Sequence, residues 1–140
     1  MELSQAQSAS LIDGLAQAAP FRFIDRVCFL DDERVVTELH RQDMPQRFAD
    51  ADALETYAAL EFAAQSSGLL LRGRKLAGAR GVIASFRGIE AQSGVPLRLP
   101  LRLESRLVSA RWTLFEFDFA VYVESQLALV GNIGIVIGRT

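Results

Sequence analysis

The chain has 140 residues, of which 50% are hydrophobic and 23% are charged. This composition is too apolar for a disordered segment, and the length suits one domain over residues 1–140. The formal net charge of -2 offers no basic surface to nucleic acid or to an anionic membrane, so neither is expected as a partner.

Cysteine and histidine each occur once, as Cys28 and His40. A single cysteine cannot form an internal disulfide, and the two residues together do not supply the ligand cluster that zinc or iron requires. The first ten residues lack the basic start and apolar run of a signal peptide. We therefore expect a cytoplasmic protein without a metal or another cofactor.

The N-terminal third predicts a helix followed by a hairpin. A short helix is expected over residues 8–18, ended by Pro20. Two strands, over residues 21–30 and 34–40, flank the polar residues 31–33, which suit a hairpin turn.

Residues 51–70 form the one long helical candidate. Strong helix formers run through this segment without proline, and Asp50 or Asp52 can cap its start. Its apolar residues cover nearly every direction around the axis instead of one stripe, so the helix is expected to be buried on most sides. Its alanines allow a flat partner to approach closely.

Four strands are expected after this helix. Between residues 112 and 124, phenylalanine and valine alternate with polar side chains, which is the period of a strand with one buried face. Leucines alternate with charged residues over 99–104, and residues 80–89 and 127–137 are rich in β-branched side chains.

This order of elements predicts the fold class. An antiparallel sheet of about six strands has an apolar face to cover, and one helix that is apolar all round can cover it. The expected architecture is α+β, a hotdog fold in which the sheet wraps round the central helix. An apolar edge strand at 80–89 or 127–137 would need a partner, so a dimer is expected.

A carboxylate on the central helix is the leading candidate for chemistry. Tyr57, Glu61 and Gln65 are spaced four residues apart and lie along one helix face. Burial between two large apolar neighbours would raise the pKa of Glu61 toward neutrality, where a carboxyl group can act as a general acid or base. The simpler alternative, which the pattern alone favours, is that Glu61 pairs with an arginine such as Arg87 or reaches solvent.

The isolated histidine and cysteine have simple structural interpretations. His40 lies at the polar end of a predicted strand, where a surface or hydrogen-bonded histidine is expected. Cys28 is interpreted as a small core residue, because nothing near it in the sequence would lower its pKa.

Two segments, PFRFIDRV at residues 20–27 and LEFAAQSSG at residues 60–68, resemble the β-hydroxyacyl-acyl-carrier-protein dehydratases of the hotdog fold. In that family a P-F-x-x-[VI]-D-R-V stretch forms the first strand, and an E-x-x-A-Q motif on the central helix carries the catalytic carboxylate. The resemblance covers about residues 17–137. It extends to dehydratase-like proteins of aryl-polyene and related polyketide clusters, which read E-Y-M-A-Q at the position of residues 61–65.

Carried over by position, the resemblance implies roles for several residues. Glu61 matches the catalytic acid and Gln65 the glutamine that supports it, while Phe86 and Arg87 match the strand beside the acyl tunnel. The family's histidine is absent from this chain. His40 is the candidate that could approach Glu61 in its place, from the end of the second strand.

Three further positions are expected to bind substrate by the same resemblance. Arg47 occupies the place of the family's histidine motif, and Thr56 lies where a proline-glycine pair opens the family's helix. Tyr57 follows on the face that carries Glu61.

Three functions then compete. The first is dehydration of a 3-hydroxyacyl thioester of acyl carrier protein or coenzyme A, within fatty-acid or polyketide-type biosynthesis. The second is thioester hydrolysis, in which Glu61 activates water and the helix amides near Thr56 and Tyr57 hold the oxyanion. The third is a non-catalytic subunit. The expected assembly is a homodimer, or a heterodimer with an active paralogue.

Overall fold

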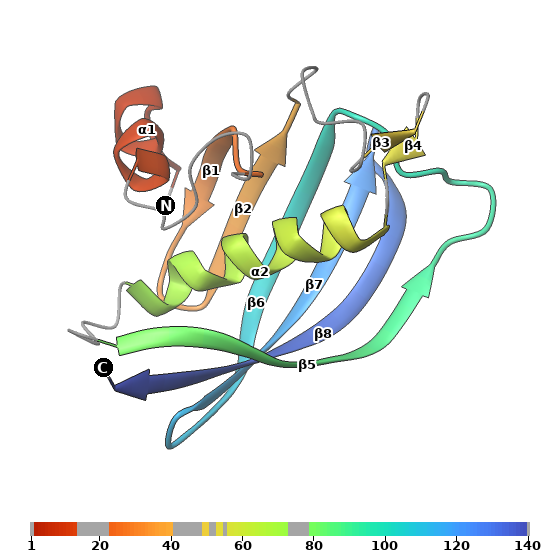
Figure 1. Ribbon diagram of the computed structural model, residues 1–140. Helices are drawn as coiled ribbons and strands as arrows, with labels where there is room; N and C mark the ends of the chain where they lie inside the picture. The colour runs from red at the N-terminus through yellow and green to blue at the C-terminus, as the bar shows by residue number, and fades with distance from the viewer. Residues whose placement is uncertain are drawn as a thin grey trace.

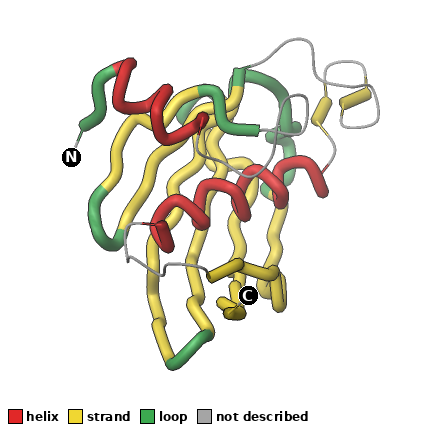
Figure 2. Tube along the Cα trace, turned by 60° about the vertical axis from the view of Figure 1, so that its left-hand side comes forward, coloured by secondary structure: helices red, strands yellow, loops and turns green. Residues whose placement is uncertain are grey.

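The fold consists of a six-stranded antiparallel sheet with one long helix along its face (Figures 1 and 2). The computed structural model describes residues 2–13, 23–40, 49–50, 53–54, 56–72 and 79–139. In chain order the elements are α1 (Gln5–Asp13), β1 (Arg26–Leu30), β2 (Arg34–Leu39), β3 (Ala49–Asp50), β4 (Ala53–Leu54), α2 (Thr56–Arg72), β5 (Ala79–Ala91), β6 (Leu101–Arg111), β7 (Leu114–Val123) and β8 (Gln126–Arg139).

The strands of the large sheet follow the order β1-β2-β6-β7-β8-β5, and every neighbouring pair is antiparallel. The helix α2 lies across this sheet, with its start above β7 and β8 and its end toward β1 and the start of β5 (Figure 1). This arrangement confirms the predicted α+β class with six antiparallel strands around one central helix. The short strands β3 and β4 form a separate two-stranded sheet just before α2.

The core lies between α2 and the inner face of the sheet. The alternation predicted for residues 112–124 is confirmed, because every second side chain of β7 is buried while those between them are half-buried or exposed. The buried set comprises Phe115, Phe117, Phe119, Val121 and Val123. In α2, ten residues are buried, and Phe62, Leu69 and Leu70 are among them. The odd-numbered residues of β7 therefore lie on the inner face of the sheet, toward the core.

The leading helix begins earlier than predicted, at Gln5 in place of residue 8, and it ends at Asp13. A reciprocal capping pair explains the start: the amide of Gln7 donates to Ser4 Oγ at 3.1 Å, and the amide of Ser4 donates to Gln7 Oε1 at 2.9 Å. Pro20, predicted to end this helix, lies outside the described residues.

The central helix begins at Thr56, not at residue 51, and runs two residues past residue 70 to Arg72. Its start is displaced because Ala53–Leu54 pair with Ala49–Asp50 as strands. Asp50 therefore belongs to β3 and does not cap the helix. Asp52, the other predicted cap, lies outside the described residues.

Several strands begin later than predicted. The first strand begins at Arg26, because residues 23–25 are irregular, and the strand predicted from residue 112 begins at Leu114. Trp112 instead occupies the β6–β7 turn, where its side chain is 99% exposed. β6 begins only after Pro100, which has no N–H to donate to a neighbouring strand.

The hairpin turn predicted at residues 31–33 is confirmed. β1 and β2 pair on either side of it, and the Asp31 carboxylate accepts hydrogen bonds from the amides of Glu33 and Arg34 at 2.8 and 2.7 Å. These two bonds hold the pKa of Asp31 below its ordinary value.

The two edges of the sheet differ. The N-terminal segment covers β1, because the amide of Leu3 donates to the carbonyl of Cys28 and the amide of Val27 donates to Ser8 Oγ. Residues 127–137, considered as a possible edge, lie in β8 between β7 and β5. β5 is the other edge, and no described strand pairs with its outer side.

Cys28 is not the core residue that the sequence predicted. It is half-buried in β1, beside the carboxylate of Glu38. Burial, together with the charge of Glu38, raises the pKa of its thiol. The thiol is therefore protonated near neutral pH, which agrees with the prediction that Cys28 is not a nucleophile.

Candidate functional site

The carboxylate predicted from the central helix lies in the second turn of α2. Glu61 is half-buried. Ala59 and Phe62, close to it in the helix, are fully buried, whereas Tyr57, one turn earlier, is exposed. Four residues further on, the amide of Gln65 donates from Nε2 to Glu61 Oε1 at 3.3 Å. The structure therefore brings together Glu61 and Gln65, as their spacing indicates.

The amide of Gln65 also binds the backbone of Phe23. The N–H of Phe23 donates to Gln65 Oε1 at 2.8 Å, and this bond is buried. Because Oε1 faces an N–H donor, Nε2 is left to face the carboxylate of Glu61, so the two contacts determine the orientation of the amide. One oxygen of Glu61 is thus held by a side chain that is itself anchored to the segment preceding β1.

Thr56 and Tyr57 lie in the first turn of α2 and are both exposed. The first four N–H groups of a helix have no acceptor within the helix, and they carry the positive end of its dipole. This turn therefore offers donors to an anionic or carbonyl oxygen. Arg47, the other predicted substrate-binding residue before the helix, lies outside the described residues.

His40 lies away from Glu61. Its Nε2 is 3.8 Å from Glu38 Oε1, and its backbone amide donates to Asp25 Oδ2 at 2.9 Å. Glu38 neighbours Thr37 in β2, and the Thr37 side chain reaches Ser66 of α2. Successive strand residues point to opposite faces, so Glu38 and the imidazole beside it are on the outer face of the sheet.

Phe86 and Arg87 are neighbours in β5, and their side chains likewise point to opposite faces of the sheet. Phe86 packs against the core, whereas Arg87 is exposed and pairs in register with Asn132 of β8. Arg87 therefore lies on the outer face, and the ion pair with Glu61 that the sequence left open is not formed in the structure.

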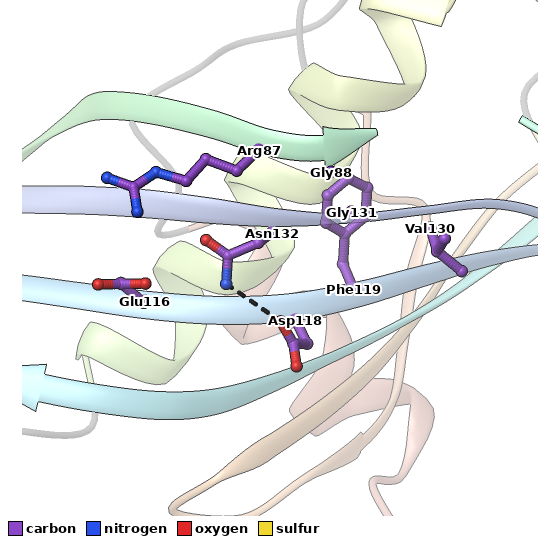
Figure 3. A pocket seen from close by; sticks show the side chains of 8 residues that line it. All are labelled: Arg87, Gly88, Glu116, Asp118, Phe119, Val130, Gly131 and Asn132. Atoms are coloured by element: carbon purple, nitrogen blue, oxygen red, sulfur yellow. Dashed lines mark hydrogen bonds between the residues drawn. The ribbon is translucent and has the colours of Figure 1, made fainter. Parts of the chain in front are cut away.

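A hollow of about 550 Å³ lies on this outer face (Figure 3). Arg87 borders it from β5, Asn132 from β8, and Glu116 and Asp118 from β7. Asn132 Nδ2 donates to Asp118 Oδ1 at 3.0 Å. Because Glu116 and Asp118 flank the buried Phe117 in β7, the hollow and Glu61 lie on opposite sides of the sheet.

Phe23, Ser66 and Ser67 were not predicted from the sequence to have a role in the site. Phe23 contributes a backbone N–H, which no residue type reveals, although it falls within the PFRFIDRV segment that resembles the dehydratases. Ser66 and Ser67 could have been predicted from the sequence to form buried hydrogen bonds, because two adjacent hydroxyls in the middle of an apolar helix require buried partners.

A six-stranded antiparallel sheet in this strand order, with one long helix on its inner face, defines the hotdog fold, and the chain has that fold. No protein-family model matches the chain, and no curated protein matches it either.

Solved structures that it matches include the dehydratase heterocomplex ApeI:P from Xenorhabdus doucetiae, with 20% identity, a TM-score of 0.75, and 90% of this chain and 89% of that chain covered. A hypothetical thioesterase with coenzyme A from Streptococcus pneumoniae has 15% identity and a TM-score of 0.64, over 82% of this chain and 88% of that chain. A thioesterase from Haemophilus influenzae has 8% identity and a TM-score of 0.72, over 99% of this chain and 93% of that chain. These likenesses confirm the fold that the resemblance implied.

None of the described helices combines the length and the apolar character needed to cross a membrane.

Proposed function

We propose that this protein binds and processes acyl thioesters as a dehydratase-like enzyme, with Glu61 as its acid and base. The observation that carries the proposal is the chain of contacts from Glu61 through Gln65 to the backbone of Phe23. A carboxylate held at one oxygen keeps the other free to accept or donate a proton. The E-x-x-A-Q pattern of residues 61–65 and the dehydratase named among the similar structures support the same assignment.

The proposed reaction converts a 3-hydroxyacyl thioester into an enoyl thioester and water. The carboxylate of Glu61 removes a proton from the carbon next to the thioester carbonyl, and the C–O bond to the hydroxyl breaks as the double bond forms. Because His40 lies on the outer face of the sheet, we assign both proton transfers to Glu61. The same carboxyl group returns its proton to the departing hydroxyl, so that water leaves and Glu61 is regenerated.

Hydrolysis of the thioester is the second candidate. The exposed first turn of α2, at Thr56 and Tyr57, lies one turn before Glu61, so its amides suit the oxyanion of a tetrahedral intermediate. Glu61 would then activate the attacking water. The thioesterases among the similar structures, one of them with coenzyme A, support this alternative.

We further propose that the protein works as a homodimer, or as a heterodimer with a paralogue, joined through β5. The strand has 13 residues, and among the described strands none pairs with its outer side. An edge this long is a template for another strand. One of the similar structures is named as a heterocomplex, which supports a two-subunit arrangement. The proposed carrier of the acyl group is acyl carrier protein or coenzyme A.

Mass spectrometry tests the reaction. Purified protein is incubated with a 3-hydroxyacyl thioester, on acyl carrier protein and separately on coenzyme A. Loss of water is the expected result, release of the free acid would establish the thioesterase, and an unchanged thioester would contradict both. Glu61→Gln should lower the rate by about 10²–10⁴, the usual contribution of a general acid or base. Glu33→Gln, in the exposed hairpin turn, is the matched control and should leave the rate unchanged.

A further inference from the structure

Four hydroxyl groups are completely buried where α2 meets the sheet. Ser66 and Ser67 belong to the helix, Thr37 to β2 and Ser105 to β6, and all four residues have no exposed surface. They form two pairs: Thr37 Oγ1 lies 2.8 Å from Ser66 Oγ, and Ser67 Oγ lies 2.7 Å from Ser105 Oγ. Both pairs therefore join the helix directly to the sheet.

The donor in the first pair follows from a count of hydrogens. A serine hydroxyl has one hydrogen, and that of Ser66 is given to the carbonyl of Phe62 at 2.8 Å. The hydrogen between Thr37 and Ser66 must then come from Thr37. Every group in this pair is satisfied, but only when the helix has this position relative to β2.

The two pairs together restrain how the helix sits on the sheet. Ser66 and Ser67 are adjacent in the helix, so their side chains diverge by about 100° around its axis. Their partners lie on neighbouring strands, because Thr37 pairs with Leu103 across the β2–β6 ladder and Ser105 is two residues from Leu103. A shift of the helix by one residue combines a turn of about 100° with a movement of about 1.5 Å along the axis, and it breaks both pairs.

The apolar contacts of α2 do not supply this restraint. Many of its buried residues are alanine or leucine, including Ala58, Ala59, Ala63, Leu69 and Leu70. Hydrophobic burial is non-directional, and small side chains let a helix slide over a flat apolar surface at little cost. A slide would leave the buried hydroxyls of Thr37, Ser67 and Ser105 without partners, which hydrophobic contacts do not compensate.

We propose that Thr37, Ser66, Ser67 and Ser105 are positioning residues that hold α2 in the one register in which Gln65 reaches both Glu61 and Phe23. Gln65 is the immediate neighbour of Ser66, and its bond to the Phe23 N–H is 2.8 Å long. A register shift of one residue would also turn the helix by about 100°, which carries the Gln65 side chain away from Phe23. The catalytic part of this inference rests on the proposed function of Glu61, whereas the restraint on the register does not.

The gentlest test removes one hydroxyl and keeps the shape of the side chain. In Thr37→Val, Ser66 still donates to Phe62, so no buried donor is left unpaired. In Ser67→Ala/Ser105→Ala, both members of the other pair are removed together. The first measurement needs no substrate: hydrogen exchange of the Phe23 amide, read by NMR together with the side-chain amide resonances of Gln65.

We expect the Phe23 amide to exchange at least tenfold faster in both variants and the Gln65 resonances to shift. Thr37→Ser keeps the hydroxyl and should keep the wild-type protection. Ile133→Val removes a methyl group from the buried part of β8, where the side chain takes no part in either hydroxyl pair, and controls for a general loss of stability. Wild-type exchange at Phe23 in both hydroxyl variants would overturn the proposal, and so would equally fast exchange in Ile133→Val.

The second measurement applies to the thioester reaction. If the pairs position Glu61, the same two variants lower kcat at least tenfold and leave KM nearly unchanged, whereas Ile133→Val changes neither. An unchanged kcat in variants with fast Phe23 exchange would overturn the catalytic part. A wild-type protein that converts no thioester would overturn only the proposed function. The hydrogen exchange of the Phe23 amide would still test whether the hydroxyl pairs hold the helix register.

Discussion

The N–H of Phe23 donates to the side-chain amide oxygen of Gln65 across 42 positions of sequence, and this buried bond of 2.8 Å ties the segment before β1 to the central helix. On its other side the same amide donates to Glu61. A single glutamine therefore links a structural anchor to the candidate catalytic carboxylate. Substitution of Gln65 should affect both the stability of the fold and the position of Glu61.

Gln65→Ala is expected to lower the free energy of unfolding by about 1–3 kcal/mol, because it removes the buried hydrogen bond between the Phe23 N–H and Gln65 Oε1. Urea unfolding followed by circular dichroism measures the change. Gln126→Ala, at an exposed position in β8, is the control and should stay within about 0.5 kcal/mol of the wild type. A Gln65→Ala protein as stable as this control would contradict the role of the Phe23 bond.

His40→Ala should leave any thioester activity unchanged. The imidazole lies beside Glu38 on the outer face of the sheet, and Glu38 keeps Arg102 at 3.5 Å as an ion-pair partner when the histidine is removed. The backbone bond from His40 to Asp25 is independent of the side chain. Steady-state kinetics compare the kcat and KM of His40→Ala with those of Glu61→Gln and the wild type. A loss of activity similar to that of Glu61→Gln would show that His40 takes part in the reaction.

Gly131→Ala should destabilise the protein by about 1–3 kcal/mol, a typical cost of overfilling a packed core. A Cβ at this position would overlap the side chain of Ile89 and would lie 2.8 Å from the ring of Phe119. Gly138, also in β8, has no atom within 4 Å of an added Cβ, so Gly138→Ala is the matched control. Thermal unfolding of the two variants should separate them by several degrees. Equal melting temperatures would show that the β5–β8 packing accommodates the methyl group.

Asp31 should make the hairpin turn sensitive to acid. Hydrogen bonds from the amides of Glu33 and Arg34 lower the pKa of Asp31 below its ordinary 3.8. The folded state then binds a proton less readily than the unfolded state, so this stabilisation is present above pH 3.8 and is lost as the pH falls through the folded-state pKa. Asp31→Asn keeps an acceptor but does not titrate. Urea unfolding between pH 2 and 6 should show a steeper acid loss in the wild type; parallel curves would contradict the assignment.

Trp112→Asn is expected to stabilise the protein by about 1 kcal/mol. Trp112 has a φ of 53° in the β6–β7 turn, a left-handed conformation that costs an ordinary side chain about that much and that asparagine tolerates. The tryptophan side chain is 99% exposed, so its removal sacrifices no packing. Calorimetry measures the change, since the variant has no tryptophan for fluorescence. A destabilised variant would show that the indole makes a contact in solution.

Local patterns in the sequence were sufficient to predict the class of the fold. The period of two in residues 112–124 and the helix formers of residues 51–70 depend on neighbours in the chain, so they predicted the strands and the central helix within a few residues. The four-residue spacing of Glu61 and Gln65 likewise placed both on one helix face. Boundaries were wrong where a local interaction competed, as at Ala53–Leu54, which pair as a strand.

Only the tertiary structure decided on which side of the sheet the candidate residues of β2 and β5 lie and which residues meet across the core. Arg87 and His40 were candidates near Glu61 by sequence, but the registers of β5 and β2 direct both to the outer face. The bonds that position the site join residues far apart in the chain: Gln65 with Phe23, Ser66 with Thr37, and Ser67 with Ser105. Patterns along the chain encode local geometry, whereas these contacts depend on strand order and helix register, which no short segment contains.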